Sequence, residues 1–184
     1  EKVIGKATSA VRDAENGQAF VQQLETDTGI SIEVISGEKE ASLIFRGITS
    51  TTSHQSDWQV ILDVGGGSTE IIVSKDQNIR HQQSFSVGSV RLLEEAKLRD
   101  PLCLRMLESF QKLLADRYDP LTKAIETNTD GAISFTLVAA GGGAVVASMH
   151  LSETENFDPV SIELSPLERT NLQALNERLS ITSL

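Results

Sequence analysis

Residues 60–73 read VILDVGGGSTEIIV, and this stretch decides the fold. An apolar run ends in a carboxylate, three glycines follow, and two hydroxyl residues lead to a second carboxylate and another apolar run. Short apolar runs bounded by glycines are typical of buried strands joined by a turn. We therefore predict strands over residues 58–64 and 69–74, with the chain turning at Gly65-Gly66-Gly67.

The segments on either side extend this pattern into an α/β layered domain. A strand over residues 79–87 follows the first two at short spacing, which indicates an antiparallel meander. Asp100-Pro101 offers an N-cap residue and a proline at the first helical position, so a long amphipathic helix is expected from there. The other expected elements are a strand leading to a turn (3–14), a helix (18–26), a strand (30–35), a helix ending at Gly47 (38–46), a loop (49–57), a strand (135–139) and two further helices (144–150 and 167–179).

Composition and charge limit the classes of function. The chain has 184 residues, of which 39% are hydrophobic and 23% charged, an ordinary globular mixture for one domain, or one domain and part of another. The formal net charge of −10 disfavours non-specific nucleic-acid binding, which needs a basic surface. No apolar run approaches the length of a membrane span. We expect neither a nucleic-acid nor a membrane partner.

The single cysteine, Cys103, excludes an intramolecular disulfide and a metal site built from several cysteines. We expect it to be a small buried apolar residue of the long helix. No signal segment opens the chain, and a lone cysteine favours a reducing compartment, so a cytoplasmic location is expected. The first residue is Glu1 rather than Met, which favours a piece of a longer protein.

The glycine turn at residues 65–67 has the composition of an anion site. Consecutive glycines let backbone N–H groups point into one concavity and let a bulky anion come close. Asp63 at the end of one strand and Glu70 in the next can flank that concavity, and two carboxylates beside a phosphate are natural ligands of Mg²⁺. The Walker A and Rossmann glycine patterns are absent. The alternative is a plain glycine-rich hairpin with a solvated glutamate.

Three further candidates are weaker on their own. Gly141-Gly142-Gly143 lies between a strand and a helix, where the helix N-terminus attracts anions, although tight turns into helices often use glycine. Arg12 offers a guanidinium that can bind phosphate with two hydrogen bonds, but it can equally pair with a neighbouring acid, Asp13 or Glu15. Glu40 would be the third residue of a helix capped by Gly37, a position where the helix dipole already favours an acid.

Taken together, four segments resemble one family. They are ATSAVRDAENG at residues 7–17, SGEKEASLIFRGI at 36–48, DVGGGSTEI at 63–71 and SVGSVRL at 86–92. In order and spacing they are similar to the exopolyphosphatase / guanosine pentaphosphate phosphohydrolase family. The resemblance is dense over the first half of the chain and rests on pattern alone over the rest. Within this set DVGGGSTE is the most specific motif.

The resemblance implies a fold. That family belongs to the actin-like (ribonuclease H-like) superfamily, in which two α/β domains, each with a mixed sheet flanked by helices, face each other across a cleft. Residues 1–40 would be the C-terminal part of the first domain, and residues 41–184 a second domain that is incomplete at its C-terminus. The chain would thus be a fragment of a two-domain cleft protein, and the fragment alone would be inactive if it lacks the family's first phosphate loop, Asp-x-Gly-Ser-Asn-Ser.

The resemblance also implies roles for residues. Glu40 would match the catalytic glutamate that orients or deprotonates the attacking water, and Asp63 and Glu70 the catalytic acids that hold Mg²⁺. The remaining residues would contact phosphate: Arg12, Gly65, Gly66, Gly67, Ser68, Thr69, Gly141, Gly142 and Gly143. One departure bears on the last three, because the family's second glycine motif carries hydroxyl residues that this chain lacks.

The implied activity is a Mg²⁺-dependent phosphohydrolase that releases terminal phosphate from inorganic polyphosphate or pppGpp by in-line attack of water. Two alternatives stay open: an ATP-dependent kinase of the same superfamily, which the SGEKEA segment argues against, and a non-catalytic nucleotide-sensing or filament-forming relative. The residues do not choose between polyphosphate and guanosine polyphosphate as the substrate partner. A homodimer of the full-length protein is possible.

Overall fold

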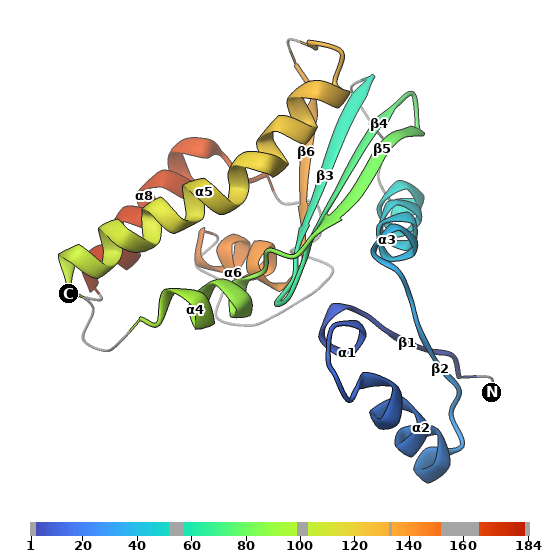
Figure 1. The fold of residues 1–184 in the computed structure, drawn as a ribbon. Coiled ribbons are helices and arrows are strands. Elements are labelled where there is room, and N and C mark those ends of the chain that lie inside the picture. Colours follow the sequence, from blue (N-terminus) through green and yellow to red (C-terminus); the bar gives the residue numbers. More distant parts are fainter. Residues whose placement is uncertain (1–2, 52–56, 99–102, 133, 152–165, 183–184) are drawn as a thin grey trace.

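The computed structural model describes residues 3–51, 57–98, 103–132, 134–151 and 166–182 (Figure 1). Its N-terminal part is small. Strands β1 (Gly5–Ala7) and β2 (Ile32–Val34) pair in parallel, and helices α1 (Ser9–Arg12) and α2 (Gly17–Thr28) connect them. Helix α3 (Gly37–Thr51) then leads into a larger layered part, seen at the top of Figure 1.

The larger part is built on a four-stranded mixed sheet in the order β5-β4-β3-β6. Strands β3 (Trp58–Val64), β4 (Thr69–Lys75) and β5 (Asn78–Phe85) are antiparallel neighbours, and β6 (Thr136–Ala140) pairs with β3 in parallel. The helices of this part are α4 (Ser89–Ala96), α5 (Leu104–Asn128), α6 (Gly142–Leu151) and α8 (Arg169–Thr182).

Helices cover both faces of the sheet (Figure 1). Successive side chains of a strand point to opposite faces. On one face, buried residues of the sheet pack with Leu121 of α5, which is 2% exposed; they are Trp58, Val60, Ile71 and Val73. On the other face, Ile61 and Ile72 pack with Ala41 and Phe45 of α3. Each fully buried aliphatic side chain contributes about 1.5–3 kcal/mol, so the sheet and these two helices form the core.

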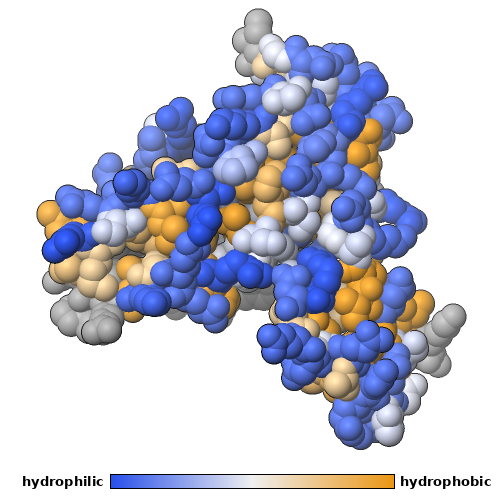
Figure 2. All heavy atoms as spheres, in the orientation of Figure 1, coloured by the Kyte–Doolittle hydropathy of each residue, from blue (hydrophilic) through white to orange (hydrophobic). Residues whose placement is uncertain are grey.

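The N-terminal part keeps apolar side chains at its surface. Val3 and Ile4, which lead into β1, are 62% and 64% exposed, and Val34 of β2 is 39% exposed. Figure 2 shows the corresponding orange surface on this part of the molecule. Within the residues described, the two-stranded sheet therefore buries little of its own apolar surface.

The expected α/β class, with a mixed sheet flanked by helices, is confirmed, and so is the antiparallel meander. The bounds of β3 are those predicted. The first element was predicted wrongly, because the chain leaves β1 at Ala7 and forms the short helix α1 instead of continuing to a turn. Helix α3 runs through Gly47 to Thr51, since apolar residues spaced along it pack on the sheet and outweigh the cost of one glycine.

Three other predictions needed correction. Helix α3 begins at Gly37 and is capped by Ser36, whose Oγ accepts a hydrogen bond from the Lys39 amide at 3.2 Å. Helix α5 is described from Leu104, with Cys103 as its N-cap residue, and Cys103 is exposed rather than buried because it precedes the packed turns of the helix. Helix α6 begins at Gly142, two residues earlier than predicted. Residues 52–56 of the predicted loop and Asp100-Pro101 lie outside the described residues.

The predicted boundary between residues 40 and 41 falls inside α3, and the two-domain division stays a prediction. None of the helices in the described parts of the chain is both long and apolar enough to cross a membrane.

Candidate active site

Asp63 and Glu70 lie opposite each other on neighbouring strands. They are direct Cα partners in the pairing of β3 with β4, which brings their side chains to one face. Strand alternation places Asp63 on the side of Ile61 and Glu70 on the side of Ile72, and this is the face that α3 covers. Since Glu40 lies in the first turn of α3, three carboxylates from separate segments converge here.

The surroundings raise the pKa of both sheet carboxyls. Burial is the main reason for the raised pKa of Asp63, and the negative charge of Glu40 adds to it. Glu70 is only 2% exposed, and burial raises its pKa as well, with smaller contributions from the charges of Glu40 and Asp63. Hydrogen bonds from Ser84 and Ser68 offset part of that rise in the Glu70 pKa. The folded chain thus holds two carboxylates where their charges are unfavourable.

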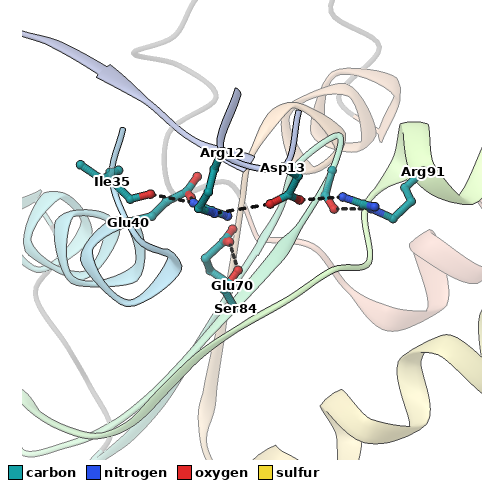
Figure 3. A network of polar contacts seen from close by, with 8 residues as sticks. Arg12, Asp13, Ile35, Glu40, Glu70, Ser84 and Arg91 are labelled. Carbon is teal, nitrogen blue, oxygen red and sulfur yellow. Dashed lines mark hydrogen bonds and ion pairs between the residues drawn. The ribbon is translucent and has the colours of Figure 1, made fainter. Parts of the chain in front are cut away.

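Arg12 contacts Glu40 rather than standing free. Its Nη1 donates to Glu40 Oε2 at 3.2 Å and to the carbonyl oxygen of Ile35 at 2.9 Å, while its Nε lies 3.7 Å from Asp13 Oδ1 (Figure 3). The alternative, an ion pair of Arg12 with a neighbour in the sequence, is therefore present with Asp13, but Arg12 also binds Glu40. Arg12 thus brings a positive charge from the N-terminal part next to Glu40, at the edge of the three carboxylates.

The glycine turn presents its carbonyls to α4. The carbonyl oxygen of Gly65 accepts from Ser89 N at 3.0 Å, and that of Gly66 accepts from Val90 N at 2.9 Å. The turn itself is closed by a bond from Gly65 N to the Ser68 carbonyl oxygen at 2.9 Å. Among the residues that the structure describes, the amides of Gly66 and Gly67 donate no hydrogen bond. The turn therefore points its carbonyls at a helix and keeps amides available for an anion.

The second glycine run, Gly141-Gly142-Gly143, begins next to the side chain of Asp63. Gly141 has φ +88°, a conformation that favours glycine, and a Cβ atom at this position would be 2.5 Å from Asp63 Oδ1. Gly142 and Gly143 form the start of α6, and neither would bring a Cβ atom within 4 Å of other residues. The structure thus places Gly141 against Asp63, while the phosphate contacts of Gly141, Gly142 and Gly143 stay a prediction.

The two hydroxyl residues after the turn have different surroundings. Ser68 is 4% exposed and hydrogen-bonded to Glu70. Thr69 is fully buried, and its Oγ1 donates to the carbonyl oxygen of Val87 at 2.5 Å. Thr69 precedes Glu70 in β4, so its side chain points to the opposite face of the sheet. A phosphate contact by the Thr69 hydroxyl remains a prediction.

The comparison with known families identifies the family of this chain. Residues 1–181 match the Ppx/GppA phosphatase family. This chain belongs to that family. The match spans the glycine turn, the convergent carboxylates and the Arg12 segment, as the resemblance of the four motifs implied.

This Ppx/GppA chain is similar to several known proteins and to solved crystal structures. Exopolyphosphatase 2 of Mycobacterium tuberculosis is 29% identical over 184 residues, covering 97% of this chain and 56% of that protein. A guanosine-5'-triphosphate,3'-diphosphate pyrophosphatase of Photobacterium profundum is 29% identical over 179 residues, covering 97% of this chain and 34% of that protein. The crystal structure of an exopolyphosphatase from Cytophaga hutchinsonii superposes with a TM-score of 0.82 at 27% identity, covering 96% of this chain and 56% of that one. The chain thus spans between a third and somewhat over half of the length of these relatives, and the predicted fold class is confirmed.

Sequence reasoning did not single out three residues that contact the candidate site. Ser84 of β5 donates from Oγ to Glu70 Oε1 at 2.7 Å. Arg91 of α4 donates from Nε to the Gly67 carbonyl oxygen at 3.0 Å and from Nη2 to Asp13 Oδ2 at 2.8 Å. Asp13 and Arg91 belong to the segments that carried the family resemblance, and that membership was the available signal. Nothing in the local sequence singles out Ser84, because its role depends on the β4–β5 register.

The carboxylates of the site are candidate ligands for a divalent cation. Within the described residues, no group of three His, Cys, Asp or Glu side chains is arranged to hold a metal ion by itself. Asp63 and Glu70 nevertheless suit Mg²⁺, because it prefers oxygen ligands and keeps several waters when only one or two carboxylates bind it. Their raised pKa values fit as well, since a cation would offset the mutual repulsion and the cost of burial.

Proposed function

We propose that the protein containing this chain is a Mg²⁺-dependent phosphohydrolase that releases terminal phosphate from polyphosphate or pppGpp. The observation that carries the proposal is the convergence of Glu40 with the Asp63–Glu70 pair beside a glycine turn with available amides. Membership of a phosphatase family supports the reaction class. The names of two relatives, an exopolyphosphatase and a guanosine-5'-triphosphate,3'-diphosphate pyrophosphatase, support phosphate chains as substrates.

In this proposal each residue has a separate task. The amides of Gly66 and Gly67 bind oxygens of the phosphoryl group. Arg12 contributes positive charge beside the same group and orients Glu40 through their hydrogen bond at 3.2 Å. Glu40 orients the attacking water and accepts its proton, as a carboxylate within hydrogen-bond reach can do. Asp63 and Glu70 hold the metal and stay in place through the strand pairing and the bond from Ser84.

The reaction would be in-line displacement, in which positioning and charge neutralisation supply most of the catalysis. Mg²⁺, when bound, neutralises the charge that develops on the phosphate oxygens. The protein contributes a rigid frame, because the carboxylates lie on a buried sheet and on the first turn of a packed helix.

Phosphate release by the full-length protein tests the proposal. Polyphosphate and pppGpp are supplied separately, each with Mg²⁺ and with a chelator, and inorganic phosphate is measured. We expect Mg²⁺-dependent release from at least one of them, and a loss of at least 100-fold in Glu40→Gln, as is typical when a general base is removed. ADP formation from ATP and a cosubstrate would instead identify a kinase. Absence of both phosphate release and ADP formation under every condition would leave only a non-catalytic role.

A further inference from the structure

Two charged residues far apart in the sequence connect the N-terminal part of the chain to the glycine turn. Asp13 follows α1, and Arg91 lies in the first turn of α4. Their side chains form an ion pair with Arg91 Nη2 at 2.8 Å from Asp13 Oδ2 (Figure 3). The pair joins segments that are 78 residues apart, and neither residue is among the candidates derived from the sequence.

Arg91 holds the glycine turn at the same time. Its Nε donates to the carbonyl oxygen of Gly67 at 3.0 Å, and its own backbone amide donates to the Gly66 carbonyl oxygen at 3.2 Å. These bonds fix the carbonyl side of the turn, so the orientation of its amides is set by Arg91 as well as by the strands. A single guanidinium thus contacts both the turn and Asp13, a geometry that the planar fork of arginine permits.

Asp13 continues the contacts toward the catalytic carboxylate. Its Oδ1 lies 3.7 Å from Arg12 Nε, and Arg12 Nη1 donates to Glu40 Oε2 at 3.2 Å. The four side chains alternate in charge from Glu40 through Arg12 and Asp13 to Arg91 (Figure 3). Each of these side chains lies next to one of opposite charge. This series of contacts therefore defines the separation between Glu40 and the glycine turn.

We propose that Asp13 and Arg91 are positioning residues, which hold the phosphate-binding turn in register with Arg12 and Glu40. The inference rests on the proposed phosphohydrolase function. The side chain of Arg91 is 43% exposed and that of Asp13 is 40% exposed, and ion pairs this exposed contribute little to stability. Asp13 and Arg91 matter more for the position of Glu40 relative to the glycine turn. A displacement of reacting groups by about 1 Å can cost on the order of 100-fold in rate.

The test uses the full-length protein with four variants: Arg91→Ala, Asp13→Ala, the double variant and Arg91→Lys. Initial rates give kcat and KM separately, and melting temperatures are measured in parallel. We expect each alanine variant to lower kcat by about 10-fold or more with a smaller effect on KM. The double variant should lose no more than the worse single variant, because both act through one contact. The kcat of Arg91→Lys should lie between that of the unmodified protein and that of Arg91→Ala, because one ammonium group cannot bind both acceptors in the same geometry.

Arg117→Ala is the matched control. Arg117 of α5 pairs with Glu95 of α4 at 50% and 37% exposure, away from the carboxylates, and its loss should leave kcat unchanged. The inference is overturned if Arg91→Ala affects kcat no more than Arg117→Ala, or if the losses of the two single variants multiply in the double variant. Glu40→Gln separates this result from the larger proposal. Full activity in Glu40→Gln, or no phosphate release by the unmodified protein, overturns the proposed function and this inference with it.

Discussion

Gly88 lies so close to Gly66 that a Cβ atom at residue 88 would be 2.4 Å from the Gly66 carbonyl oxygen. Gly88 is the N-cap residue of α4 and has an extended backbone, with φ −149°, that any residue can adopt. The need for glycine at this position is therefore one of space. The close approach lets the first amides of α4 reach the carbonyls of the glycine turn.

Gly88→Ala should disturb the turn. The added methyl group meets backbone atoms, which cannot move as a flexible side chain can, so we expect a loss of about 1–3 kcal/mol in the free energy of unfolding. Phosphate release should fall more than stability alone explains, because the turn amides are displaced. Denaturant titration and phosphate release measure the two effects.

Gly47→Ala is the matched comparison for that substitution. Gly47 lies inside α3, and a Cβ atom there would meet nothing within 4 Å. Alanine should therefore stabilise the helix by about 0.5–1 kcal/mol and leave phosphate release unchanged. Equal effects of Gly88→Ala and Gly47→Ala on stability would show that the close approach of Gly88 has no energetic importance.

Neutralising the sheet carboxyls should stabilise the protein at neutral pH while abolishing its activity. The pKa values of Asp63 and Glu70 are raised in the folded state, mainly by burial, so their charges oppose folding at pH 7. For carboxyls with raised pKa values, stability is fully present below the unfolded value of about 4 and is lost as pH rises through the folded pKa. Asp63→Asn and Glu70→Gln should each raise the melting temperature at pH 7 by on the order of 2–4 °C, without metal.

The pH dependence provides the check on this prediction. The gain from Asp63→Asn or Glu70→Gln should shrink as the pH is lowered toward about 4, because the unsubstituted carboxyls then become neutral too. Glu108→Gln, at an exposed position of α5, serves as the control and should change the melting temperature little at any pH. A melting temperature that falls at pH 7 in both site variants would contradict the electrostatic description of the site.

Mg²⁺ should stabilise the unsubstituted protein in the absence of substrate. A ligand that binds only the folded state raises stability by about 2.7 kcal/mol at 100 times its dissociation constant. Because the proposed metal site offers two protein carboxylates, binding should be weak, and the melting temperature should rise gradually over millimolar MgCl₂. The combined Asp63→Asn and Glu70→Gln variant should show no rise beyond that given by NaCl at equal ionic strength. An identical Mg²⁺ response in that variant would place the ion elsewhere.

Thr69 should prove more important for stability than for phosphate binding. Thr69→Val keeps the shape of the side chain but leaves the buried carbonyl of Val87 without its 2.5 Å hydrogen bond, at a cost of about 1–3 kcal/mol. Thr69→Ser retains the hydroxyl and should cost less. Chemical denaturation ranks the variants, and KM for the phosphate substrate should be similar in both. A large rise in KM for Thr69→Val alone would instead support a phosphate contact by this hydroxyl.

The local elements followed from the sequence because they depend on near neighbours. The apolar runs on both sides of Gly65-Gly66-Gly67 predicted β3 and β4 and their antiparallel pairing, since a short glycine turn leaves adjacent strands little other choice. A hairpin that turns at these glycines brings Asp63 close to Glu70, so the sequence pattern alone favours their proximity. The motif segments likewise indicated the family from the sequence alone.

The sequence by itself determined the α/β class, the central hairpin and the family to which its motifs belong. Only the tertiary structure decided that Thr69 binds the carbonyl of Val87, that Ser84 supports Glu70, and that Asp13 reaches Arg91 across 78 positions. The physical reason is range: hydrophobic periodicity and turn chemistry act between neighbouring residues, whereas these contacts depend on how the packed sheet orients α3, α4 and the N-terminal part against one another.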